Sequence, residues 1–301
     1  MNVMEQYFNI FKRLVRSVSK PCPVCDHDAE GIRSSLKDAI VIAETAVSVL
    51  DSSFDNEKVQ KMAKWILGDD ALFGQKVDRA KLYLKYLTQI DKVENTDIMR
   101  LGSFADETDV IIYCDQSNYE TRNNLLFDKI IGKPVEDPDS ERVLRDCYDP
   151  SLKTSGTTAM TSHSSDYDTT FLDRYKDWVK GGRQGIFPMF KEARIPHKDK
   201  PCTTNICVWS EAGDFLPDDE TATPIDSLLN TLTGTLLHEL THTISGGNAM
   251  DDDEDGDSYG WDDIGRLKNA DNSDSINALG ICMYLFSKGY WVDDDGDIQK
   301  L

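Results

Sequence analysis

The first ninety residues carry apolar side chains at the spacing of amphipathic helices. Between residues 29 and 50 they recur every three or four positions, which places them on one face of a helix. Residues 59–66 and 77–90 repeat the pattern. The amino-terminal part is therefore predicted to form two or three helices. The apolar positions of the first helix are Ile32, Leu36, Ile40, Ala43, Ala46 and Leu50.

Two short segments have the composition of buried strands. Residues 109–114 contain the run Val-Ile-Ile-Tyr, and residues 205–209 read Asn-Ile-Cys-Val-Trp. Runs of β-branched and aromatic residues favour strands. Residues 154–170 are rich in serine and threonine, and they predict a surface loop.

These patterns together predict an α+β fold that is mainly helical and contains a small sheet. No linker rich in Pro, Gly and Ser separates the helical start from the rest. Residues 1–301 are therefore expected to form a single domain. Residues 1–100 would be its helical amino-terminal part, and residues 101–301 would carry the strands and the functional site.

The charge of the chain narrows the choice of partners. It has 54 acidic and 33 basic residues, and its net charge is −21. Binding to a phosphate backbone needs clustered Lys and Arg, so nucleic acid and anionic membranes are not expected as partners. No apolar run reaches the roughly 18 residues of a membrane span, and residues 1–20 lack the continuous apolar core of a signal peptide.

The seven cysteines are too few for a disulfide scaffold in a chain of this length, and their odd number leaves at least one unpaired within a monomer. Cys22 and Cys25 form one CxxC pair, followed by His27. A zinc site would need a second half, so a structural disulfide or two ordinary thiols is the preferred interpretation.

The segment 225–244 carries the chemistry. Its apolar positions form one stripe, its polar positions another, and Pro224 and Gly246-Gly247 bound it, which predicts a helix of about twenty residues. The polar face reads His-Glu-Leu-Thr-His from His238 to His242, an HExxH motif. Histidines four residues apart on a helix can bind one Zn²⁺, and Glu239 beside them can accept a proton from the metal-bound water.

A catalytic zinc site needs a third protein ligand. No histidine follows His242, Glu254 lies in an acidic run, and Cys282 lies in an apolar stretch. Ser245 and Asn248 stand where a metzincin would have Gly and His, which excludes that class in its usual form. Elimination leaves aspartate, and the acidic run 251–257 supplies several.

With these residues the sequence resembles the aspzincin metalloendopeptidases, the group of deuterolysin and the fungal peptidyl-Lys metalloendopeptidases. It is more closely similar to fungal proteins with HELTH followed by YGW. The family pattern is HExxH, then GTxDxxYG, then an Asn-Ala-Asp sequence before a helix. Here these parts are residues 238–242, 255–260 and 269–272, the last before a helical stretch at 276–286. The resemblance covers about fifty residues.

The resemblance implies a zincin-like fold with zinc held by His238, His242 and one aspartate. It also implies that Tyr259 stabilises the oxyanion. The family's ligand lies three residues before the tyrosine, where this chain has Gly256, so Asp255 and Asp257 beside it are both candidate ligands. Asp255 is preferred, because groups at i and i+4 share one side of a helical turn.

The acidic residues also allow a calcium interpretation. Residues 251–262 partly match an EF-hand loop, and residues 293–297 form a second DxDGD-like fragment. Position 12 of the loop is Asp262 where the motif has Glu. A solvated acidic loop is the preferred interpretation for both runs.

The function expected from these residues is that of a zinc-dependent metalloendopeptidase, a hydrolase of protein or peptide substrates with Glu239 as general base. The resemblance implies secretion. The alternative is a zinc-binding or interaction protein without turnover, which the altered Asp–Tyr spacing favours.

Overall fold

The computed structural model divides into two compact units, the helical unit (residues 1–15, 26–94 and 209–301) and the strand unit (residues 16–25 and 95–208). Strands β1 (Arg13–Val18) and β2 (Ile90–Asn95) lie where the chain passes from one unit to the other. The structure describes residues 13–18, 29–95, 109–113, 118–122, 125–135, 159–162, 165–167, 194–196, 202–206, 223–251 and 260–301.

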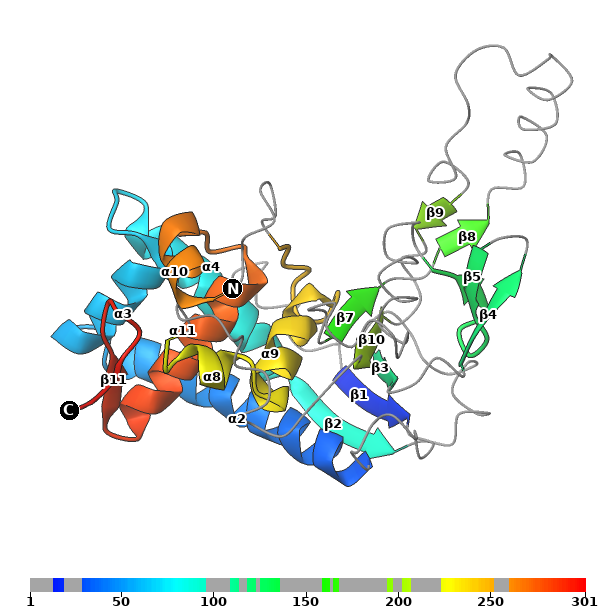
Figure 1. Cartoon of the computed structure of the whole chain (residues 1–301), viewed down its shortest axis with the longest axis horizontal. Helices are drawn as coiled ribbons and strands as arrows, with labels where there is room; N and C mark the ends of the chain where they lie inside the picture. The colour runs from blue at the N-terminus through cyan, green and yellow to red at the C-terminus, as the bar shows by residue number, and fades with distance from the viewer. Residues whose placement is uncertain are drawn as a thin grey trace, which may run out of the picture. The chain divides into compact units, whose positions relative to one another are not determined.

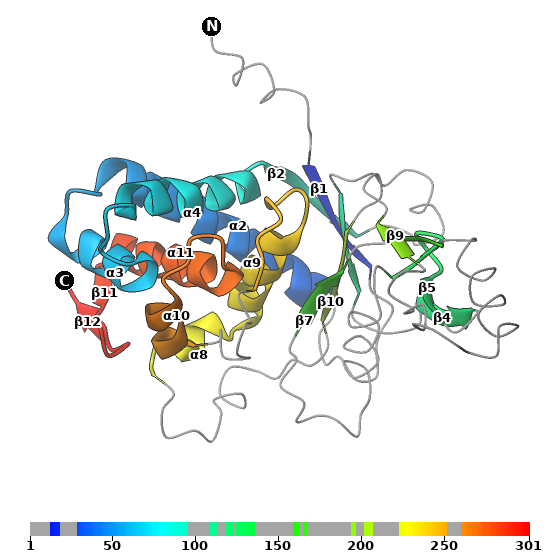
Figure 2. The same ribbon diagram turned by 90° about the horizontal axis from the view of Figure 1, so that it is seen from above.

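The helical unit contains helices from the amino-terminal and the carboxy-terminal parts of the chain. Its amino-terminal helices are α2 (Ala29–Ser52), α3 (Glu57–Leu67) and α4 (Phe73–Leu87). From the carboxy-terminal part come α8 (Asp226–Leu229), α9 (Leu232–His242), α10 (Trp261–Leu267) and α11 (Ser273–Ser287). An antiparallel hairpin follows, β11 (Tyr290–Val292) with β12 (Ile298–Lys300). Helices α2, α9 and α11 pack against one another (Figures 1 and 2).

The predicted amino-terminal helices are confirmed. The apolar stripe of α2 is buried against α11, α9 and α4, except that Ile40 is only partly buried. The third predicted helix is displaced towards the amino terminus, because α4 runs from Phe73 to Leu87 and Ile90 begins β2. Burying such a stripe stabilises a helix far more than its intrinsic propensity does.

A buried carboxylate fastens α8 to α10. Asp226 accepts hydrogen bonds from the backbone and hydroxyl of Thr223 and from the backbone of Trp261, each of 2.8 Å. The indole of Trp261 is fully buried and stacks on Trp65, with the ring centroids 6.1 Å apart. The bond between Asp226 and Trp261 joins the two residues that flank the segment from 227 to 260.

The strand unit contains small sheets. Strand β10 (Cys202–Ile206) pairs in parallel with β3 (Val110–Tyr113) and antiparallel with β7 (Ala159–Ser162). Strands β4 (Tyr119–Arg122), β5 (Leu125–Asp128) and β6 (Lys133–Pro134) form an antiparallel sheet, and β8 (Ser165–Tyr167) pairs with β9 (Arg194–Pro196).

The strand expected at 109–114 is present as β3. Of the strand expected at 205–209, residues 205 and 206 belong to β10, which begins earlier, at Cys202, and residues 207–209 lie outside the described residues. The loop expected over 154–170 is wrong in part, because it contains β7 and β8. Pairing with β10 satisfies the backbone of β7, and β-branched threonine fits a strand although it is polar.

A buried carboxylate also lies in the strand unit. Asp128 accepts hydrogen bonds from the Tyr113 hydroxyl (2.9 Å to the nearer oxygen) and from the backbone of Ile130 and Ile131 (2.8 and 3.0 Å). Burial raises the pKa of Asp128 to about 6, although these bonds act in the opposite direction. The carboxyl group therefore takes up a proton on folding at mildly acidic pH.

The α+β class is confirmed by this mixture of helices and small sheets. The single-domain expectation stays a prediction. Helix α9, with the HExxH motif, packs against the amino-terminal helices α2 and α4. Within the described ranges, no helix combines the length and apolar character needed to cross a membrane.

Candidate metal centre

The predicted helix over 225–244 is wrong in one respect, because it is broken into α8 and α9. Thr231 caps α9, and its hydroxyl accepts a hydrogen bond of 3.1 Å from the backbone of Gly234. The carbonyl of Leu229 approaches so closely that a Cβ on Gly234 would lie 2.3 Å from it. The periodicity of apolar residues continues through this break, so the pattern alone gave one helix.

Helix α9 ends directly after the motif. It stops at His242, with Thr243 as its C-cap, and the Thr243 hydroxyl accepts a 2.9 Å hydrogen bond from the backbone of Gly246. A Cβ on Gly246 would lie 1.8 Å from the Leu240 carbonyl, so only glycine permits this reversal. The connector, residues 243–250, then brings the chain back alongside the helix end.

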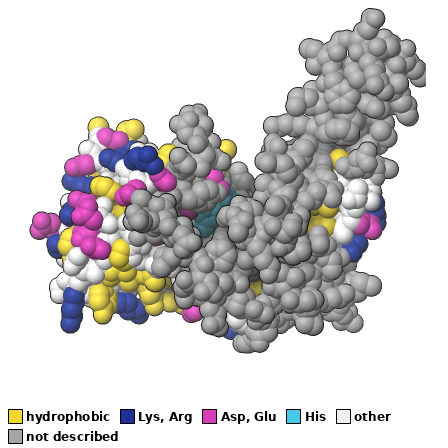
Figure 3. Space-filling model, viewed as in Figure 1, with side chains coloured by type: hydrophobic (Ala, Val, Ile, Leu, Met, Phe, Trp, Pro, Cys, Tyr) yellow, Lys and Arg dark blue, Asp and Glu magenta, His cyan; other side chains and the backbone are white. Residues whose placement is uncertain are grey.

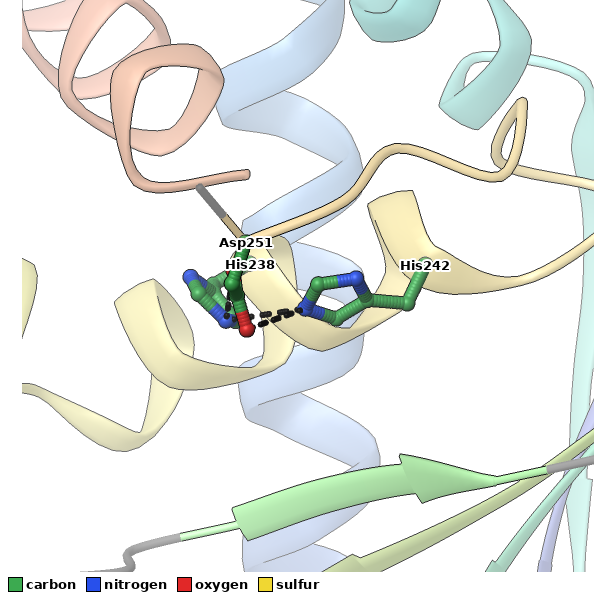
Figure 4. A group of neighbouring side chains, drawn as sticks. All are labelled: His238, His242 and Asp251. Atoms are coloured by element: carbon green, nitrogen blue, oxygen red, sulfur yellow. Dashed lines mark hydrogen bonds and ion pairs between the residues drawn. The ribbon is translucent and has the colours of Figure 1, made fainter. Parts of the chain in front are cut away.

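The two histidines face one point, as predicted. The Nε2 atoms of His238 and His242 are 3.0 Å apart (Figure 4). Both residues lie on α9, one turn apart, where side chains at i and i+4 meet. Two donors on an ion with bonds of 2.0–2.1 Å in tetrahedral geometry stand about 3.3 Å apart. The spacing of the imidazoles is therefore close to what one metal ion requires.

Asp251 completes the group. One carboxylate oxygen lies 3.5 Å from Nε2 of His238, and the other lies 3.4 Å from Nε2 of His242. Figure 4 shows the carboxylate pointing at both rings. In the part of the chain that the structure describes, this is the one group of three His, Cys, Asp or Glu side chains that could hold a metal ion.

The outward nitrogens of both rings have partners of their own. Nδ1 of His238 lies 2.9 Å from the Asp274 carboxylate. Nδ1 of His242 lies 2.9 Å from the Ala249 carbonyl and 3.2 Å from the Ser273 hydroxyl. When Nδ1 donates to a carboxylate or carbonyl, Nε2 presents its lone pair to a metal, and the ring is held in orientation.

The site attracts positive charge. Burial lowers the pKa of His238, but the neighbouring carboxylates, first of all Asp274, outweigh this effect and raise it to about 10. Burial likewise opposes a raised pKa at His242, where the bond to Asp251 prevails. The pKa of Asp251 is lowered despite its burial, because both imidazoles stabilise its charge. A metal cation would take the place of the protons between these groups.

Glu239 is buried beside the pair, with 4% of its surface exposed. Its carboxylate is one of the groups that, against the effect of burial, raise the pKa of both histidines. Its carboxylate is therefore part of the negative charge that surrounds the two histidines. The site itself is reachable, since the side chain of Asp251 is 28% exposed and histidine surface is visible beside acidic groups (Figure 3).

Three predicted site residues, Asp255, Asp257 and Tyr259, lie outside the described residues, and their roles stay predictions. The structure instead brings Asp251 to the histidines. Elimination from the sequence had left Asp251 among the candidates, but the spacing between Asp and Tyr in the resembling family directed the choice further along. Asp274 was missed; its sequence signal is its place in the first turn of α11, after the N-cap Asn272.

The calcium interpretation gains no support at the second acidic run. The Asp293 carboxylate accepts hydrogen bonds from the backbone of Asp295 and Asp297 and from the side chain of Gln299, at 3.2, 2.9 and 3.0 Å. It serves as the cap of the loop between β11 and β12. The first run falls largely on residues 252–259, which lie outside the described residues. Cys22, Cys25 and His27 also lie outside them.

Comparisons of the chain with models of protein families, with curated proteins and with solved structures found no match.

Proposed function

We propose that the chain is a zinc-dependent metalloendopeptidase of zincin-like architecture, with zinc held by His238, His242 and Asp251. The observation that carries this proposal is the group of two Nε2 atoms and a carboxylate oxygen that lie within 4.8 Å of one another. The oriented Nδ1 atoms support it, because such bonds prepare imidazoles for a metal.

The donor set suits zinc, which accepts imidazole nitrogen and carboxylate oxygen and keeps a position open in catalytic sites. Two histidines and one carboxylate also suit Fe(II). The HExxH motif favours zinc, because it adds a glutamate directly beside the first ligand. Bound zinc would polarise the substrate carbonyl and lower the pKa of a water molecule.

We assign the role of general base to Glu239. It follows His238 on α9, and its buried carboxylate acts electrostatically on both histidines. In the proposed reaction it takes the proton from the attacking water and passes it to the leaving amine. Asp274 holds the His238 ring through Nδ1 while this happens.

The resemblance to aspzincins supports peptide substrates, an extracellular location and a role for Tyr259 at the oxyanion. The position of Asp251 beside both histidines supports the hypothesis that the acidic run supplies the third ligand. Asp251 stands earlier in this run than Asp255 and Asp257.

A second candidate is a zinc-binding protein without turnover. The observation in its favour is Gly256, which stands where the resembling family has its ligand, three residues before the tyrosine. In that case the chain would bind the metal, but it would lack a correctly placed side chain to stabilise the oxyanion.

Replacement of the proposed base tests the two candidates. Glu239→Gln removes the base and no ligand, so the purified variant should keep its zinc and its fold while casein digestion falls by at least a hundredfold. Glu44→Gln, an exposed change on α2, is the matched control.

Wild-type digestion should stop with a chelator and return with zinc. Equal digestion by Glu239→Gln and wild type would contradict the mechanism. Bound zinc without digestion in the wild type would support the second candidate.

A further inference from the structure

Asp251 differs from the other two candidate ligands in being outside a helix. It follows the connector 243–250, so its position depends on what holds that connector. Its neighbour Met250 is fixed on both sides: its backbone N–H donates to the Asp271 carbonyl, and its carbonyl accepts from the backbone of Ser273, each at 3.1 Å. Met250 and Asn272 form an isolated parallel bridge.

The 271–274 segment thus touches the surroundings of all three candidate ligands. Asp274 bonds to Nδ1 of His238, and the Ser273 hydroxyl lies 3.2 Å from Nδ1 of His242. The bridge to Met250 reaches the residue before Asp251. A shift of this segment would therefore move the ligands relative to one another.

The segment is itself anchored on α4. The Tyr83 hydroxyl donates a 2.6 Å hydrogen bond to the Asp271 carboxylate, which also pairs with Arg79. The side chains of Arg79 and Asp271 are about half exposed, and exposed pairs contribute little. Tyr83 is 3% exposed. Burial and Asp271 raise the pKa of Tyr83 to about 12, so the phenol keeps the proton that it donates.

The ring of Tyr83 also supports the connector. Gly247 has a φ of 110°, and a Cβ there would lie 2.6 Å from Cδ1 of Tyr83. The backbone of the connector therefore lies directly on the aromatic ring. One side chain holds both chain segments that determine where Asp251 stands.

We propose that Tyr83 is a positioning residue of the metal centre, which sets Asp251 against the two histidines through Asp271 and Gly247. It does not contact the metal. This inference rests on the metal site of the proposed function. The hydroxyl of Tyr83 controls the register of the 271–274 segment, and the ring of Tyr83 controls the path of the connector.

Tyr83→Phe tests this role, because it removes the hydroxyl and leaves the ring under Gly247. The zinc affinity of the full chain, measured by competition with a chromophoric chelator, should fall about tenfold, as for other groups that orient metal ligands. Tyr290→Phe, which removes a hydroxyl from a 41% exposed tyrosine in β11, is the matched control and should leave the affinity unchanged.

Asp271→Ala and the double variant separate positioning from a general loss of stability. If the hydroxyl acts through Asp271, the double variant should lose no more zinc affinity than Asp271→Ala alone. Thermal unfolding of the metal-free variants is followed in parallel.

Full zinc affinity in Tyr83→Phe, an equal loss in Tyr290→Phe, or additive losses in the double variant would overturn the inference and leave the proposed function standing. A wild-type chain that binds no zinc would overturn both.

Discussion

Whether Gly234→Ala stabilises or destabilises the protein depends on the break between α8 and α9, where Gly234 makes a close contact. If residues 225–244 formed one helix, Gly234→Ala would stabilise it by about 0.5–1 kcal/mol, because alanine has the higher helix propensity. In the structure the new Cβ would lie 2.3 Å from the Leu229 carbonyl and 2.8 Å from that of Leu228. Ordinary contact needs about 1 Å more than the shorter distance, and both atoms are backbone.

The chain must therefore shift at the start of α9, and overpacking of this kind costs about 1–3 kcal/mol. For a protein of 301 residues the expected fall in Tm is about 1.5–2 °C for each kcal/mol. Differential scanning calorimetry measures it. Gly74→Ala in α4 is the matched control, because its Cβ would meet nothing within 4 Å and should stabilise the protein slightly. A higher Tm for Gly234→Ala would refute the two-helix arrangement.

Two further predictions concern buried carboxylates. Because the pKa of Asp128 is raised on folding, its protonated form stabilises the folded strand unit below about pH 4; this contribution, about 3 kcal/mol, is lost as the pH rises through about 6. Urea unfolding between pH 4 and 7 should show this decline in the wild type but not in Asp128→Asn, and equal pH profiles would contradict it. Asp226→Ala leaves the backbone of Thr223 and Trp261 without its acceptor and should cost about 2–4 kcal/mol. Urea unfolding measures this loss, and a change below about 0.5 kcal/mol would count against it.

The sequence was sufficient for those elements whose apolar residues follow one period. The stripe from Ile32 to Leu50 predicted α2 well, and the i, i+4 spacing of His238 and His242 placed both imidazoles on one point. The break at Thr231 could not be found in this way. It depends on a capping hydroxyl and on a close approach at Gly234, and neither changes the apolar periodicity.

The third ligand depends on tertiary structure. Asp251 follows a connector whose path is fixed by Tyr83 and by the bridge to Asn272, contacts between residues far apart in the chain. From the sequence, the aspartates of the acidic run are equivalent, and only a family spacing could rank them. The sequence can place Asp274 in the first turn of a helix, but its bond to His238 follows from the packing of α11 on α9.

Zinc content after dialysis, compared among three aspartate variants, tests the central claim most directly. The wild type should retain about one zinc ion for each chain by elemental analysis. We expect Asp255→Ala and Asp257→Ala to retain it and Asp251→Ala to lose it, because the Asp251 carboxylate faces both Nε2 atoms. Zinc retained by Asp251→Ala and lost by Asp255→Ala or Asp257→Ala would contradict the account.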